Sequence, residues 1–216
     1  IEMNLLIDSL HYHWRQRTDY FAGGNMFIYF SAEQARNRDY RGPDFFVVTG
    51  VDGTRDRGSW IVWEENGRYP NVIIELASPS TIHTDLGFKK DLYERVFRTT
   101  EYFCYDPGGP ELLGWRLDAG EYRALKPNAH GWLWSHELDA WLGAWQGEFL
   151  RLQQTWLRLY GSDGALIPVV GEAEAQRAAT EAQRAHEALQ RAEVAETEVA
   201  RLRALLAGKN GTHGNG

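Results

Sequence analysis

The sequence predicts an α/β fold with a β-rich extension and a C-terminal helical tail, on three observations. Two runs are apolar and β-prone, Phe45 to Thr49 and Val72 to Ala77, and the first is apolar on both faces, as a strand is when both sides of a sheet are covered. Amphipathic spacing over Met3 to Arg17 and Thr84 to Arg98 predicts two helices that could cover such a sheet. After Gly171 the composition changes abruptly to Ala, Glu, Gln and Arg.

Length and composition favour a single core with an appendage, since 216 residues at 43% apolar content can bury one domain interior. The single cysteine, Cys104, allows no internal disulfide and favours a reducing, cytoplasmic setting. No apolar run approaches membrane-spanning length, and no basic segment followed by an apolar one opens the chain, so we expect neither a membrane nor a secreted protein. The chain begins at Ile1, so residues could precede it.

The net charge of −7 bears on the partner. Nucleic-acid binders usually have a basic surplus or a basic face, so any binding of DNA by this chain should be weak and sensitive to salt.

The first elements after the N-terminal helix are short. Met26 to Phe30 is aromatic and β-prone, which predicts a strand. Ser31 followed by Gln34 has the spacing with which a serine caps a helical turn.

Asp44 lies at the start of the strand Phe45 to Thr49. It follows Pro43, which favours extended backbone at Gly42. A turn aspartate satisfied by nearby backbone donors is the favoured interpretation of this residue alone.

Glu75 is more informative because it lies inside the strand Val72 to Ala77, on the face of Ile73 and Ala77. A glutamate in such a run pairs with a base or binds a metal. If Asp44 lies on an adjacent strand, the two carboxylates repel each other, and a divalent cation would relieve that repulsion.

Lys89 lies on the helix Thr84 to Arg98, where Asp85, Lys89 and Tyr93 are successive i,i+4 neighbours on one stripe. We expect Asp85 to aim Lys89 and Tyr93 to flank it. Without the two strand acids, Lys89 and Asp85 would be an ordinary surface ion pair worth about 0.3 kcal/mol.

The β-rich extension is predicted as two hairpins, Leu112 to Leu117 with Tyr122 to Leu125, and Leu157 to Tyr160 with Ala165 to Val170. A tryptophan group lies between them and either packs or forms a stacking platform for a sugar or base: Trp132, Trp134, Trp141 and Trp145.

The tail has small and apolar residues three and four positions apart, with one skipped step, along Ala175, Ala178, Ala182, Ala185, Leu189, Ala192, Ala195, Val199, Leu202 and Leu206. This spacing predicts a coiled coil with a stammer, while a single, partly frayed helix is the alternative. The expected organisation is a domain over 1–170, a helical coiled-coil tail over 171–207 and a disordered terminus over 208–216.

These motifs together resemble the Uma-two family of proposed bacterial endonucleases, in the PD-(D/E)XK, or restriction-endonuclease-like, superfamily. The resemblance covers roughly Met3 to Pro168 and includes Ser78-Pro79-Ser80 and the segment from Glu101 to Pro107. It implies a mixed β-sheet core flanked by helices, with Asp44 and Glu75 as the two acidic metal ligands.

In that superfamily a lysine usually follows the second acid by two residues, but position 77 is alanine here. The resemblance places the lysine on the next helix, at Lys89, with Lys90 as the less aligned candidate. Glu2 is a weaker match to a glutamate that some superfamily members have on the first helix.

The favoured function is therefore a metal-dependent endonuclease that hydrolyses phosphodiester bonds in DNA. Asp44, Glu75 and Lys89 would be catalytic, Asp85 and Tyr93 supporting, and Mg²⁺ the cofactor, with Mn²⁺ as an alternative. The tail would form a homodimer. The main alternative is a catalytically inactive module of the same fold that recruits an unknown protein partner through the coiled coil, and carbohydrate binding by the tryptophans is a third.

Overall fold

The computed structural model describes residues 1–36, 42–108 and 112–210, and the chain divides into two compact units, Ile1–Val169 and Val170–Gly216. In the first unit the helical elements are α1 (Glu2–His13), α2 (Ala32–Arg36), α3 (Ile82–Thr84), η1 (Asp85–Lys89), α4 (Lys90–Leu92) and η2 (Tyr93–Phe97). Its strands are β1 (Tyr20–Gly23), β2 (Ile28–Tyr29), β3 (Phe45–Thr49), β4 (Trp60–Ile61), β5 (Val72–Leu76), β6 (Glu101–Tyr105), β7 (Leu112–Asp118), β8 (Glu121–Ala124), β9 (Leu133–Ser135), β10 (Ala140–Phe149) and β11 (Leu152–Tyr160).

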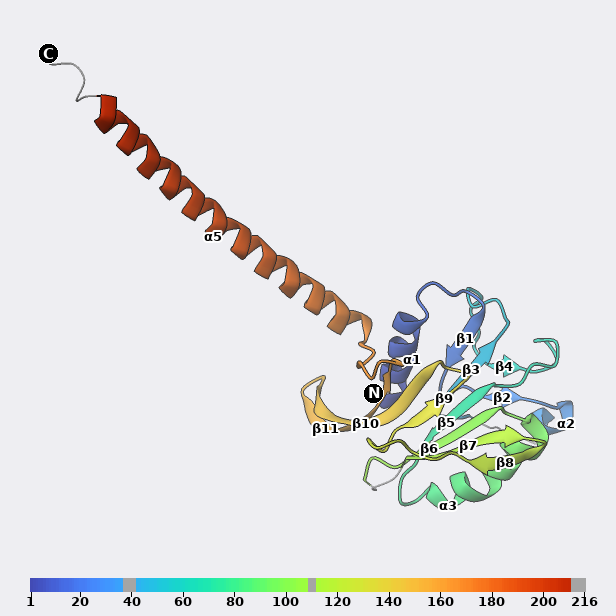
Figure 1. Cartoon of the computed structure of the whole chain (residues 1–216). Helices are drawn as coiled ribbons and strands as arrows, with labels where there is room; N and C mark the ends of the chain where they lie inside the picture. The colour runs from blue at the N-terminus through green and yellow to red at the C-terminus, as the bar shows by residue number, and fades with distance from the viewer. Residues whose placement is uncertain (37–41, 109–111, 211–216) are drawn as a thin grey trace, which may run out of the picture. The chain divides into compact units, whose positions relative to one another are not determined.

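A mixed six-stranded sheet forms the centre of this unit, in the order β1-β3-β5-β6-β7-β8 (Figure 1). The pair β5 and β6 is parallel, and every other neighbouring pair in this sheet is antiparallel. The predicted mixed sheet flanked by helices is therefore confirmed.

The two faces of the sheet have separate cores because side chains alternate along each strand. One face packs Val72 and Ile74 against α1 and the smaller sheet β11-β10-β9. The other face packs Ile73 and Ala77 against Tyr93 and the rest of the helical segment that begins at α3. Figure 1 shows α1 and α3 on opposite sides of the sheet. The sequence predicted this division of the β5 side chains.

The predicted helix Thr84 to Arg98 is one continuous helical segment, but two of its turns, η1 and η2, are π-helical. Such wide turns are rare, and they are frequent at functional sites. The segment ends where Arg98 adopts a left-handed conformation, with φ of 53°, and the N–H of Thr99 donates to the carbonyl of Tyr93.

The first predicted hairpin is present as β7 and β8, whereas the second is wrong. Strand β11 pairs along its whole length with β10, and Tyr160 makes only an isolated bridge to Leu166. Trp141 and Trp145 belong to β10 itself. Gly143 and Gly147 interrupt the apolar pattern of that strand because tryptophan rings lie over both of them, at the positions that a Cβ atom would occupy.

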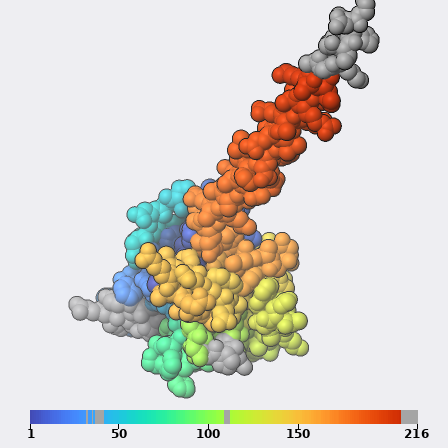
Figure 2. All heavy atoms as spheres, turned by 90° about the vertical axis from the view of Figure 1, so that its left-hand side faces the viewer, coloured from blue at the N-terminus to red at the C-terminus, as the bar shows by residue number. Residues whose placement is uncertain are grey.

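The second unit consists of the helix α5 (Val170–Asn210). Every residue from Glu174 to Leu206 is exposed. Figure 2 draws the atoms of this helix in orange to red. The helix includes residues 208–210, which were expected to belong to a disordered terminus, and residues 211–216 of that terminus lie outside the described residues. None of the helices in the described ranges combines the length and the apolar character needed to cross a membrane.

Candidate active site

Asp44 is held at the end of the ladder between β3 and β5. Phe45 is the register partner of Ile74 in this antiparallel pair, so the next position out on each strand brings Asp44 opposite Glu75. The backbone N–H of Leu76 donates to Oδ2 of Asp44 at 2.8 Å. Asp44, directly before β3, and Glu75 in β5 therefore lie opposite each other on adjacent strands, where their charges repel.

Glu75 is completely buried between the central sheet and the helical segment. The hydroxyl of Tyr93 donates to its Oε1 at 2.7 Å, and the Nζ atom of Lys89 lies 3.0 Å from its Oε2. Burial raises the pKa of Glu75 to about 7, and the charge of Asp44 acts in the same direction, while Lys89 and Tyr93 oppose the increase. This carboxyl group therefore changes its charge near neutral pH.

Lys89 bridges two buried acids, with its Nζ atom 2.8 Å from Oδ1 of Asp85 as well as close to Glu75. Burial lowers the pKa of Lys89, but the charges and hydrogen bonds of Glu75 and Asp85 outweigh burial and leave the pKa above its ordinary value. Its side chain keeps 23% of its surface exposed. A charged ammonium group is thus held between the acids with access to solvent.

The neighbouring Lys90 has a different environment. Its Nζ atom lies 5.2 Å from the ring centre of Trp115 and 5.6 Å from that of Tyr122, which are cation–π distances. The helix thus directs Lys89 to the acids and Lys90 to the aromatic rings.

Glu2 lies close enough to Asp44 for their charges to interact, although its match in the sequence was weak. The backbone N–H of Leu157 donates to Oε1 of Glu2 at 2.6 Å. Burial raises the pKa of Glu2, the hydrogen bond from Leu157 opposes this, and the charge of Asp44 raises the pKa further. Glu2 and Asp44 are therefore electrostatic neighbours. The signal in the sequence was only a glutamate at the start of an amphipathic helix, a common position for an acid.

Glu101 shows how a buried glutamate is satisfied without a metal. Its carboxylate accepts hydrogen bonds from Arg116, from Ser135 and from the backbone N–H of His136. Each of its two carboxylate oxygens accepts two hydrogen bonds, so Glu101 has a structural role, whereas each oxygen of Glu75 has a single donor in the described part of the chain, Tyr93 or Lys89.

The oxygen ligands present at Asp44 and Glu75 suit a hard divalent cation, and three observations test this fit. Among the described residues, the chain donates a hydrogen bond to Oδ2 of Asp44 and none to Oδ1, so Oδ1 can still coordinate. The mutual repulsion of Asp44 with both Glu75 and Glu2 favours a cation near Asp44. Within the described ranges, no three His, Cys, Asp or Glu side chains form a ready ligand set, so water, backbone and substrate oxygens would complete it.

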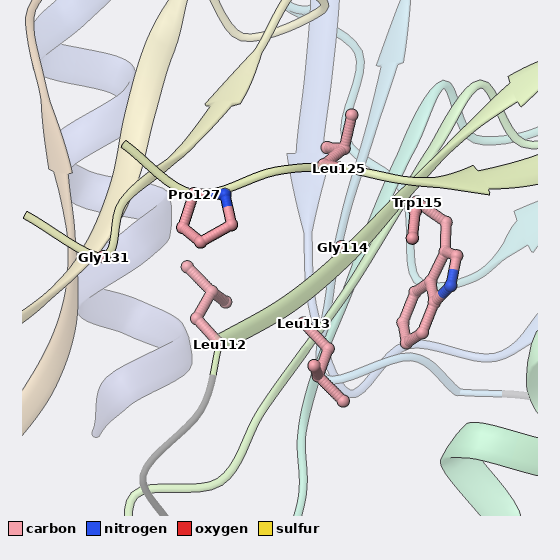
Figure 3. A pocket seen from close by; sticks show the side chains of 8 residues that line it. Leu112, Leu113, Gly114, Trp115, Leu125, Pro127 and Gly131 are labelled. Carbon is pink, nitrogen blue, oxygen red and sulfur yellow. The ribbon is translucent and has the colours of Figure 1, made fainter. Parts of the chain in front are cut away.

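An apolar hollow of about 360 Å³ is lined by residues of β7, β8 and the segment after β8, none of which has a titratable side chain. Figure 3 shows Leu112 and Pro127 facing this space from β7 and from the segment after β8. Its lining has none of the chemistry that Asp44, Glu75 and Lys89 offer.

The tryptophan group has mostly a packing role. Trp132 stacks on Tyr160 with ring centres 3.9 Å apart, and Trp134 meets Trp141 edge to face at 66°. These contacts agree with the packing role, one of the two alternatives that the sequence left open for the tryptophan group.

A mixed α/β sheet with two carboxylates at a strand end and a lysine on the next helix is the arrangement expected of a nuclease-like protein. The family model of Uma2, described as "Putative restriction endonuclease", matches residues 3–146. The chain belongs to this family, and the resemblance seen in the sequence is confirmed.

Among solved structures, the chain is similar to one described as a "putative nuclease belonging to DUF820" from Anabaena variabilis ATCC 29413. The sequence identity is 14%, the TM-score is 0.42, and the match covers 61% of this chain and 68% of the other. No curated protein matches the chain.

Proposed function

We propose that the protein is a metal-dependent endonuclease that hydrolyses phosphodiester bonds in DNA, with Asp44, Glu75 and Lys89 as its catalytic residues. The observation that carries the proposal is the position of Lys89. Its ammonium group is 3.0 Å from the buried carboxylate of Glu75, on the strand next to Asp44, and it remains partly exposed. A surface ion pair would need none of these features.

Asp44 and Glu75 would hold the cation, which is most simply Mg²⁺, with Mn²⁺ as a substitute. A bound divalent ion would supply positive charge to the phosphate and lower the pKa of an attacking water. Glu75 can ionise for this purpose near neutral pH because its pKa is about 7.

Lys89 would donate hydrogen bonds to the water or to a phosphate oxygen, where negative charge grows in the transition state. Asp85 and Tyr93 have positioning roles in this proposal. Asp85 holds the ammonium group as a second carboxylate beside Glu75, and Tyr93 fixes the orientation of the Glu75 carboxylate. Family membership supports a nuclease activity, and DNA is the substrate that the family description suggests.

The test is to incubate the full chain with supercoiled and single-stranded DNA in Mg²⁺, Mn²⁺ or chelator, beside the variant Asp44→Asn. We expect cleavage that needs the metal and falls by at least about 100-fold in the variant. Asn keeps the volume of Asp44 and removes its charge, so a folded, inactive variant separates the loss of a ligand from the loss of structure. Cleavage that persists in chelator, or that Asp44→Asn leaves unchanged, would overturn the proposal.

A further inference from the structure

The exposed surface of α5 has a stripe of apolar side chains without a cover. Leu189, Val199, Leu202 and Leu206 keep 65%, 45%, 48% and 64% of their surfaces exposed. A helix whose residues 174–206 are all exposed gains nothing from burial within its own chain, and long helices owe most of their stability to packing. A partner that covered this stripe would therefore stabilise the helix.

The spacing along the stripe identifies the geometry of that partner. Residues 174–178 and 181–185 have the same sequence, EAQRA, seven positions apart. In heptad positions a to g, Ala175, Ala182 and Leu189 are a residues, and Ala178 and Ala185 are d residues. From Ala192 to the next seam residue, Ala195, the spacing is three residues where a continuous heptad needs four. This shifts the heptad assignment, so that Val199 and Leu206 are a residues and Leu202 is a d residue.

The residue types favour two strands, because a β-branched residue at a with leucine at d is the combination that parallel dimers prefer. Val199 at a and Leu202 at d meet this condition in the most apolar part of α5.

The charges beside the stripe favour a parallel arrangement. In a parallel dimer each g residue lies beside the e residue of the next heptad in the partner, which brings Glu198 next to Arg203 twice across the two-fold axis. An antiparallel dimer places g residues beside g residues, and the charged g residues here are all glutamates: Glu174, Glu181 and Glu198. Like charges at those positions would repel.

We propose that α5 binds α5 of a second copy of this chain as a parallel, in-register, two-stranded coiled coil. The contact is firmest between Val199 and Leu206 and weaker along the alanine-rich start of the helix. The proposal concerns assembly and holds independently of any nuclease activity.

The first test measures the molar mass of the full chain by sedimentation equilibrium over a range of concentrations. We expect a dimer that dissociates on dilution, and a monomer for Val199→Glu, which puts charge into the seam. Thr197→Glu lies outside the seam and is the matched control that remains dimeric. A monomeric parent protein at every concentration, or a dimer that Val199→Glu does not weaken, overturns the proposal.

Orientation is tested by oxidative crosslinking of Val199→Cys. In a parallel, in-register dimer the two new thiols face each other, so a covalent dimer should form that reductant removes. The native Cys104 is buried, so the parent protein should give no covalent dimer, nor should Thr197→Cys gain one. A dimer by mass in which Val199→Cys fails to crosslink would be antiparallel or out of register, and either result contradicts the proposal.

The charge pair gives a third readout. Glu198→Arg should raise the dissociation constant roughly tenfold, because two attractive contacts become repulsive, and adding Arg203→Glu should restore it. Within its own helix Glu198 also lies 3.5 Å from Arg201, and the double swap leaves Arg201 in place, so restored affinity would show pairing across the dimer. Failure of the double variant to regain affinity counts against the parallel register.

Discussion

The hydroxyl of Tyr93 donates a hydrogen bond to Oε1 of Glu75 at 2.7 Å, inside the core between the central sheet and the π-helical turn that contains Tyr93. This contact fixes one oxygen of Glu75 while Lys89 approaches the other. It stabilises the ionised carboxylate, because it lowers the pKa of Glu75 against the effect of burial.

Removing that hydroxyl should therefore affect activity through the pKa of Glu75. In Tyr93→Phe we expect the acidic limb of the pH–rate profile to move to higher pH, and unfolding to become easier by about 1–3 kcal/mol because a buried oxygen loses its donor. Tyr122→Phe is the matched control, since its hydroxyl donates to the carbonyl of Thr99 away from Glu75. An equal shift of the limb in both variants would mean that Tyr93 has no special effect on Glu75.

The raised pKa of Glu75 predicts a pH-dependent stability in chelator. The folded state, with a pKa of about 7 against 4.5 ordinarily, holds more protons than the unfolded state across this window. The free energy of unfolding should therefore fall as pH rises from 4.5 to 7, by about 1–3 kcal/mol from this group.

Glu75→Gln cannot titrate, so in this variant that decline should disappear when denaturant unfolding is measured between pH 4.5 and 8. Glu101→Gln is the control, because Glu101 is also a buried glutamate but its carboxylate is held by Arg116 and several other donors. This variant should keep the decline. If wild type and Glu75→Gln lose stability in parallel over this range, Glu75 is not the titrating group.

Gly24 should prove necessary for the position of Asp44. A Cβ atom at Gly24 would overlap the carbonyl oxygen of Asp44 and crowd the side chain of Met3. In Gly24→Ala the backbone at Asp44 must move, so we expect a loss of about 1–3 kcal/mol in stability and a fall in cleavage rate even where the variant is fully folded.

The matched control is Gly58→Ala, since a Cβ atom at Gly58 meets nothing within 4 Å. Rates are measured well below both melting temperatures. A folded Gly24→Ala with the activity of Gly58→Ala would show that the close approach does not position Asp44.

Several parts of this fold could be predicted because they depend on local pattern. The two-residue period divided the β5 side chains between two cores, and the i,i+4 spacing placed Asp85, Lys89 and Tyr93 on one stripe of the helix. The preference for Lys89 over Lys90 came from the family resemblance. The π-helical turns could not be predicted, because they depend on how Tyr93 and Phe97 pack against the sheet and not on a sequence period.

The remaining errors arise from long-range contacts. Strand β10 was missed because Gly143 and Gly147 interrupt its pattern of β-prone residues. The structure needs glycine at both positions, since the rings of Trp132 and Trp145 lie over them. Glu2 received little weight because its approach to Asp44 depends on α1 packing beside β11, 155 residues away along the chain. Such contacts have no local signal in the sequence.

We propose to test the action of Lys89 on the substrate, beside Asp44 and Glu75, by comparing the DNA cleavage rates of Lys89→Ala and Lys90→Ala in Mg²⁺. The two variants remove the same charge from adjacent positions on one helix, so they share any general effect on DNA binding. We expect a loss of roughly 100-fold or more for Lys89→Ala and a change of no more than about threefold for Lys90→Ala. Equal rates for the two folded variants, or a larger loss for Lys90→Ala, would contradict a catalytic role of Lys89.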